Sequence, residues 1–305
     1  MVEIKEKNIY IDGEPQLILC GEIHYFRLEK TEWQDRINKL KAAGCNAVAT
    51  YVPWICHEPI EGNLDLMGKT RPELDLVGYI DLCHQNGLYF IIKPGPFIMA
   101  EMKNEGLPYW VYEKHSEIKP IGWDGALGPT PTVDYTHPHF LMEVERWYES
   151  VMSVVAPRLF QFGGPIIAVQ LDNEVGMLDW VSNTPDLTDD VIASFTNWLN
   201  ATYGVGELNK RYPCELTTSA IRSPDDSYAT VLHMDLGHFM RNRFAKYIEK
   251  LREYAETNGV SGIPFIVNIH GTGGGRGFTF PIGISQLYES YTQAPGTFQV
   301  GYLFW

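Results

Sequence analysis

The segment with the most chemical information is the apolar run 166–171, which opens directly into Asp172, Asn173 and Glu174. A continuous apolar run of strand-forming residues is typical of a parallel strand buried on both faces. Pro165 has no backbone N–H to donate, so it is tolerated at the first residue of such a strand and marks where the run begins. A carboxylate at the carboxyl end of a buried parallel strand lies where barrel enzymes place their catalytic acids and bases. The simpler alternative is an Asn-Glu turn after an ordinary strand.

Three further segments share this design and favour the chemical interpretation. Strands are predicted over 17–25, 46–53 and 88–95. Each ends in acidic, imidazole or aromatic residues, and these are Glu22, His24, Tyr25, Trp54, His57, Glu58 and Glu101. A rim of this composition suits a ligand that has hydroxyl groups for hydrogen bonds and C–H faces for aromatic rings. The pattern therefore indicates an enzyme or a sugar-binding barrel.

Four motifs in a fixed order narrow this further. They are Gly21–Tyr25, Thr50–Trp54 with His57-Glu58-Pro59, Lys93–Glu101 with Gly106–Trp110, and Val169–Gly176. In these motifs, spread over roughly residues 8 to 295, the chain resembles the β-galactosidases of glycoside hydrolase family 35. The resemblance implies a (β/α)8 TIM barrel and a hydrolase that cleaves terminal β-galactosides with retention of configuration. Lys93 departs from the arginine that the family leads us to expect at that position.

The resemblance also implies roles for single residues. Retaining glycosidases use two carboxyl groups roughly 5–5.5 Å apart, one as proton donor and one as nucleophile. Glu174 corresponds to the acid/base, and its pKa has to be raised if it is to hold a proton near neutrality. The residues that correspond to substrate contacts are Tyr51, Ala100, Glu101 and Asn173. The nucleophile is expected on a later strand, beyond the end of this chain. Glu289 is a poor match for it.

Other residues of the rim leave two interpretations open. Glu22 and His24 suit a structural role as well as they suit a sugar contact. The rings of Trp54, Trp110 and Trp123 could stack on a sugar or fill the core. Asp172 shares strand parity with Glu174, and a supporting role behind the site is the preferred interpretation.

The composition excludes several classes of function. The chain has 305 residues and a formal net charge of −14, and no basic patch indicates a nucleic-acid partner. No stretch approaches 18 apolar residues, and the first seven residues, four of them charged, contain no apolar stretch, so neither a membrane span nor a signal peptide is predicted. The five cysteines are scattered, without a CxxC or His/Cys cluster. We expect a cytoplasmic protein with free thiols, no metal and no cofactor.

The order of elements predicts the fold. Further strands are expected over 165–172, 263–270 and 298–304, and helices over 31–44, 74–86, 138–160 and 233–258. This alternation indicates an α/β fold, a (β/α)8 TIM barrel in one domain over residues 1–305. Five or six of the eight barrel strands are present, so the barrel is expected to be incomplete and to need a missing C-terminal segment of the same polypeptide. The glycine-rich segment 272–284 is expected to be a rim loop.

The sequence is consistent with two functions. The first is a β-galactosidase-type hydrolase, and a related exo-glycosidase for another sugar is a variant of it. The second is an inactive carbohydrate-binding remnant, which would keep the sugar contacts without a nucleophile. In both cases the expected partner is a small-molecule carbohydrate.

Overall fold

The computed structural model describes residues 1–6, 8–129, 131–182, 185–269 and 299–302. Six strands form one sheet in chain order, and every neighbouring pair is parallel. They are β4 (Cys20–Glu22), β5 (Ala47–Tyr51), β6 (Tyr89–Gly95), β7 (Ile166–Leu171), β8 (Phe265–Ile269) and β9 (Gln299–Tyr302). Within the described ranges no pairing joins β9 to β4. The predicted fold class, an incomplete α/β barrel, is confirmed.

The central strands form where the sequence has largely apolar runs. Every residue of β5 and of β7 is buried, as expected for strands covered on both faces. The first predicted strand, 17–25, is wrong in extent, because the structure has a strand only over 20–22 there. Leu17 and Leu19 are 76% and 49% exposed, so the apolar residues before Cys20 do not belong to a buried strand. At the other end, residues 25–27 form a 3₁₀ turn.

Four helices correspond to the predicted ones. They are α1 (Trp33–Ala42), α3 (Leu76–Gln85), α5 (Pro138–Val155) and α10 (Ala229–Thr257). The Asp75 carboxylate caps α3 by accepting the N–H of Gly78 at 2.8 Å. Helix α5 ends five residues before the predicted 160, and the chain continues as a 3₁₀ turn over Ala156–Arg158, because Pro157 has no backbone N–H to extend the α-helical hydrogen bonds. Thr31 does not cap α1, because it lies inside a preceding 3₁₀ turn.

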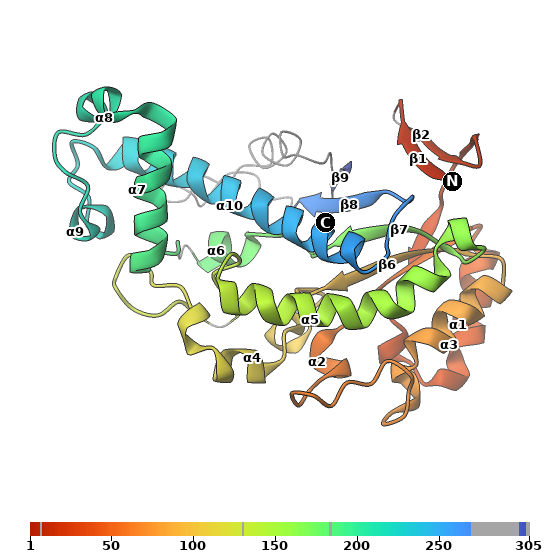
Figure 1. Ribbon diagram of the computed structural model, residues 1–305. Helices are drawn as coiled ribbons and strands as arrows, with labels where there is room; N and C mark the ends of the chain where they lie inside the picture. Colours follow the sequence, from red (N-terminus) through yellow and green to blue (C-terminus); the bar gives the residue numbers. More distant parts are fainter. Residues whose placement is uncertain (7, 130, 183–184, 270–298, 303–305) are drawn as a thin grey trace.

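Several elements were not predicted. An antiparallel hairpin sheet precedes the barrel strands, with β1 (Val2–Lys5), β2 (Asn8–Ile11) and β3 (Glu14–Gln16). The other additions are helices: α2 (Trp54–His57), α4 (Tyr109–Lys114), α6 (Met177–Ser182), α7 (Asp189–Tyr203), α8 (Val205–Arg211) and α9 (Thr218–Arg222). Helices α7, α8 and α9 gather at one end of α10, away from the hairpin (Figure 1). Among the described residues, no helix has the length and apolar character needed to cross a membrane.

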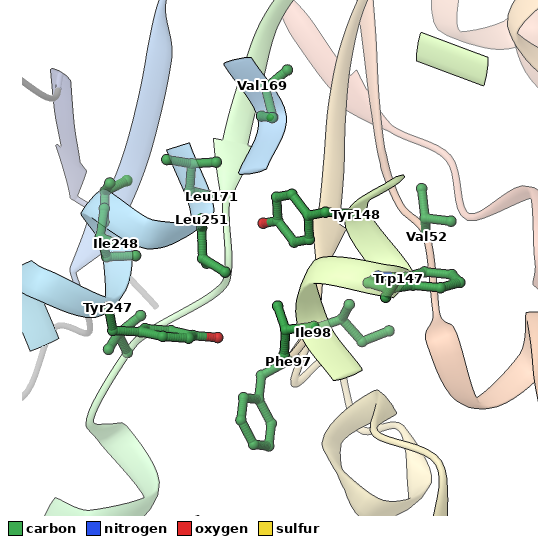
Figure 2. Packing of buried hydrophobic residues seen from close by; sticks show 14 of the residues in the cluster. Val52, Phe97, Ile98, Trp147, Tyr148, Val169, Leu171, Tyr247, Ile248 and Leu251 are labelled. Atoms are coloured by element: carbon green, nitrogen blue, oxygen red, sulfur yellow. The ribbon is translucent and has the colours of Figure 1, made fainter. Parts of the chain in front are cut away.

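Helices α5 and α10 lie side by side and cover the sheet near β7 (Figure 1). In Figure 2, Leu251 of α10 and Tyr148 of α5 lie near Leu171 at the end of β7, and Trp147 of α5 lies beside Val52. The two aromatic residues also hold the end of β6. The indole of Trp147 donates to the Pro94 carbonyl at 2.8 Å, and the hydroxyl of Tyr148 donates to that of Gly95 at 2.6 Å. The core thus fixes the strand ends from which the candidate site is built.

Candidate active site

The site begins at the turn that follows β7. Asp172, Asn173 and Glu174 are 1%, 4% and 6% exposed, so all three polar residues are buried. Asp172 and Glu174 have positive φ angles of 55° and 52°, a left-handed conformation that is uncommon outside glycine. The Asp172 carboxylate supports the turn by accepting the backbone N–H of Phe97 at 3.0 Å and of Asn173 at 2.8 Å. The predicted supporting role of Asp172 fits this geometry.

Burial changes the acidity of this carboxyl group. It raises the pKa of Asp172 to about 7, while the Tyr247 hydroxyl and then the N–H groups of Asn173 and Phe97 act in the opposite direction. Burial dominates because the side chain is enclosed by the core beneath the turn. Asp172 therefore holds a proton in the folded protein at pH values where an exposed aspartate is ionised.

Asn173 connects four strand ends through its amide. Its Oδ1 accepts from the Tyr51 hydroxyl at 3.1 Å, from Gln170 Nε2 at 3.2 Å and from Asn268 Nδ2 at 2.6 Å. Its Nδ2 donates to the carbonyl of Ile98 at 3.1 Å. A carbonyl can only accept, so this contact fixes which amide atom is nitrogen. An amide nitrogen carries two hydrogens, so one N–H of Asn173 has no partner among the described residues and could bind a ligand.

Glu174 lies next to this network. Its backbone N–H donates to Asn268 Oδ1 at 3.1 Å, which ties the turn after β7 to the end of β8. Burial raises the pKa of Tyr51 to about 12, with further contributions from the charges of Glu174 and Glu101. The pKa of Glu105 is also raised, by burial first and then by the same two carboxylates. Glu174, Glu101 and Glu105 therefore share one electrostatic environment beside Tyr51.

The loop after β6 carries the other predicted contacts. Met99, Ala100 and Glu101 have consecutive positive φ angles of 52°, 53° and 50°. Glu101 is exposed, and its carboxylate forms no hydrogen bond or ion pair with the residues that the structure describes. The carbonyl of Ala100 accepts from the Arg27 guanidinium, so the group of Ala100 left for a backbone contact is its N–H. The structure thus joins Tyr51 and Asn173 directly and leaves Glu101 open to a ligand.

The first strand adds a charged pair to the rim. Lys93 is 6% exposed, forms an ion pair with Glu22, and lies 4.7 Å from the centre of the Tyr51 ring. The His24 ring lies 5.5 Å from that of Tyr51. Burial, followed by the charge of Arg27, lowers the pKa of His24 to about 4, so this imidazole is neutral at pH 7.

Two tryptophans considered for sugar stacking are core residues. Trp54 stacks on Trp147 with ring centroids 5.3 Å apart, and its indole donates to Glu58 Oε2 at 2.7 Å. The Trp110 indole donates to the Glu58 carbonyl at 3.0 Å. Glu58 is fully buried and pairs with Arg146 through two bonds of 2.8 and 3.1 Å. Trp54 and Glu58, which follow the end of β5, therefore stabilise the fold.

Asn268, which contacts both Asn173 and the backbone of Glu174, was not predicted from the sequence. The available signal was an asparagine inside the otherwise apolar strand β8. A polar side chain at a buried position needs a hydrogen-bonding partner, and the structure shows that Asn268 is buried. Glu289, the weak nucleophile candidate, and the glycine-rich segment 272–284 lie outside the described residues. A second catalytic carboxylate is therefore not assigned within the described part of the chain.

A parallel α/β sheet whose strand ends collect acids, amides and a tyrosine has the architecture of the barrel-type glycoside hydrolases. The model of the glycosyl hydrolases family 35 matches residues 8–257, and the chain belongs to this family. The family resemblance stated from the motifs is confirmed.

Curated relatives show several activities within this similarity. The exo-beta-D-glucosaminidase of Thermococcus kodakarensis is 37% identical over 262 residues, which are 81% of this chain and 33% of that protein. The beta-1,2-glucosyltransferase of Ignavibacterium album is 31% identical over 297 residues, 95% of this chain and 41% of that protein. The beta-galactosidase of Mus musculus is 39% identical over 165 residues, 54% of this chain and 23% of that protein. The chain thus spans less than half the length of these relatives.

A solved structure shows the same fold at low sequence identity. The β-galactosidase from the haloarchaeon Halorubrum lacusprofundi superposes with a TM-score of 0.70 at 16% identity, covering 94% of this chain and 40% of that one.

Proposed function

We propose that residues 1–305 form one partial catalytic barrel, the sugar-binding and acid/base part of a retaining exo-β-glycosidase that acts on terminal β-galactosides. The observation that carries the proposal is the buried Asn173-Glu174 pair at the end of β7, joined to Tyr51 and Asn268. Glu174 would protonate the departing glycosidic oxygen and then activate the incoming water. The nucleophile would be a carboxylate outside the described residues of this chain.

The geometry of Asn173 supports a sugar with a 2-hydroxyl group. Its one remaining N–H can donate to such a hydroxyl, a contact that strengthens in the transition state of glycoside hydrolysis. Tyr51 and the open carboxylate of Glu101 would contact other hydroxyl groups, with the backbone N–H of Ala100 beside them. We also infer that the ligand is a small carbohydrate, that the protein needs no cofactor for this reaction, and that it acts in the cytoplasm.

Specificity for a β-glucosaminide is the second candidate, because the similarity to glucosaminidases extends over more of the chain. The exo-beta-D-glucosaminidases match 81% of the chain, whereas the mammalian β-galactosidases matched at 39% identity cover 54–57% of it. A protonated glucosaminide carries an ammonium group, which has no lone pair to accept the Asn173 N–H. Such a substrate would instead need Glu101 or Glu105 next to its 2-position.

Hydrolysis of a panel of nitrophenyl glycosides tests the proposal. The β-galactoside, β-glucosaminide and β-glucoside are compared with wild-type protein, Glu174→Gln and the surface control Glu149→Gln, which makes the same change on the exposed face of α5. We expect the galactoside to be turned over fastest and Glu174→Gln to lower that rate by roughly 10²–10⁴-fold, with the control unchanged. Full activity in Glu174→Gln contradicts the assignment. Saturable galactose binding without turnover of any glycoside supports a carbohydrate-binding remnant instead.

A further inference from the structure

A second group of chemically reactive side chains lies between α4 and α5, outside the candidate active site. His115, Glu117 and His139 each offer one ligand atom, and these atoms lie within 4.8 Å of one another. His115 Nδ1 is 3.4 Å from Glu117 Oε1, and His139 Nδ1 is 2.5 Å from the same oxygen. The structure brings these residues together although the sequence separates the two histidines by a long loop.

A buried carboxylate sets the orientation and the tautomer of His115. Glu143 is 2% exposed and its Oε1 lies 3.0 Å from His115 Nε2. Two cations pair with this carboxylate: Lys114 Nζ lies 2.8 Å from Glu143 Oε1, and Arg146 Nε lies 3.3 Å from Glu143 Oε2. An ionised carboxylate can only accept, so Nε2 carries the hydrogen of the neutral ring. The other nitrogen, Nδ1, then presents its lone pair.

That lone pair faces a carboxylate. Two electron-rich atoms 3.4 Å apart, His115 Nδ1 and Glu117 Oε1, repel each other unless a cation lies between them. The cation can be a proton on His115 or a metal ion. A histidine that donates one N–H to a buried carboxylate and presents its other nitrogen outward has the arrangement found at metal centres.

We propose that His115 Nδ1, Glu117 and His139 Nδ1 bind a divalent transition-metal ion of the zinc class, with Glu143 orienting His115. Ligands at about 2.0–2.2 Å from a tetrahedral ion lie about 3.3–3.6 Å apart, which matches the His115–Glu117 separation. The shorter His139–Glu117 contact is a hydrogen bond that the ion would replace. Both of these side chains are about half exposed, at 54% and 45%, so they can adjust.

The donor set selects the kind of metal. Two imidazole nitrogens and one carboxylate suit Zn²⁺ and its neighbours, whereas Mg²⁺ and Ca²⁺ prefer oxygen ligands alone. Three protein ligands leave one tetrahedral position for water. The ion would bridge the end of α4 and the start of α5. The loop between them includes Tyr135, whose hydroxyl accepts the N–H of Gly176 at 3.4 Å, two residues beyond Glu174. The site would therefore brace the loop behind the candidate active site.

Calorimetric titration of the untagged chain with zinc chloride at pH 7.5 tests the proposal. We expect one Zn²⁺ per chain, at least tenfold weaker binding in His139→Ala and Glu117→Gln, and a roughly 10–100-fold loss in Glu143→Gln. His84→Ala, an exposed histidine on α3, is the matched control and should bind as wild type does. Mg²⁺ at the same concentration should give no heat of binding.

The two exposed ligands make the test decisive. If Glu143→Gln fails to fold, His139→Ala and Glu117→Gln still report on the site, because a change at a half-exposed side chain leaves the core intact. Substitution with Co²⁺ should give the intense visible absorption of a tetrahedral ion in wild type and lose it in His139→Ala. Absence of zinc binding, or wild-type affinity in His139→Ala, would overturn the proposal. Because binding is read as heat, this result does not depend on hydrolase activity.

Discussion

Replacing Asp172 by asparagine is expected to stabilise the protein at neutral and alkaline pH. Burial raises the pKa of Asp172 from 3.8 to about 7. In the unfolded chain this carboxyl group releases its proton near pH 4, whereas in the folded protein it keeps the proton until about pH 7. Between these values the unfolded state binds fewer protons, so the stability of the wild type falls as pH rises through this window and is constant above it.

The size of the effect follows from the shift. A displacement of about 3 pKa units corresponds to about 4 kcal/mol as an upper bound. The side-chain amide introduced by Asp172→Asn would keep an oxygen for the N–H groups of Phe97 and Asn173 and cannot ionise. The free-energy difference between Asp172→Asn and wild type should therefore be small at pH 4 and grow by about 2–4 kcal/mol toward pH 8.

Urea unfolding from pH 4 to 8.5 measures this difference directly, since titration of all other groups cancels between the two proteins. Asp226→Asn, in an exposed loop, is the matched control and should show no such trend. A difference that stays constant across the range would refute the reasoning, because it would mean that the carboxylate is ionised in the folded protein and is stabilised by its two N–H donors.

Three further substitutions test the network and its support. Asn268→Ala removes the acceptor of the Glu174 N–H and should lower stability by about 1–3 kcal/mol in urea unfolding; equal stability would show that this bond contributes little. Tyr51→Phe should lower stability by about 1 kcal/mol and weaken sugar binding in a calorimetric titration, and unchanged binding would remove Tyr51 from the site. Glu58→Gln should lower stability by about 2–3 kcal/mol, because the partly exposed Arg146 loses its buried carboxylate; a neutral result would contradict the structural role of Glu58.

The sequence predicts the central barrel strands well because strands that are buried on both faces need nearly continuous apolar runs, which are easy to recognise. Strands β5 and β7 are buried along their length and apolar apart from Thr50 and Gln170, and both lie where predicted. The hairpin β2–β3 was missed although its two strands are joined by Asp12-Gly13, a pair typical of tight hairpin turns. Both residues have the positive φ angles that such a turn requires, 53° and 85°. Helix α7 was missed because it packs on α10 through Phe195 and Phe239 and lies outside the strand–helix alternation.

The candidate site was less predictable because its contacts join residues far apart in the chain. Asn173 and Glu174 are recognisable from the strand that precedes them, but the bond from Asn268 to Asn173 links residues 95 positions apart. Trp54 and Glu58 show the opposite difficulty. They follow a strand end just as ligand-binding residues do, and only their burial against Trp147 and Arg146 reveals that they stabilise the fold.

The role of Glu174 as proton donor is tested by the dependence of hydrolysis on the leaving group. A dinitrophenolate leaves without protonation, whereas a simple alcohol needs the proton of a general acid. For a retaining hydrolase, kcat/KM reports the first step alone, in which the leaving group departs. In Glu174→Gln, kcat/KM for a dinitrophenyl β-galactoside should therefore stay within about tenfold of wild type, while kcat/KM for an alkyl β-galactoside falls by roughly 10²–10⁴-fold. An equal loss of kcat/KM on both substrates, or no loss on either, would contradict the assignment of Glu174 as the general acid.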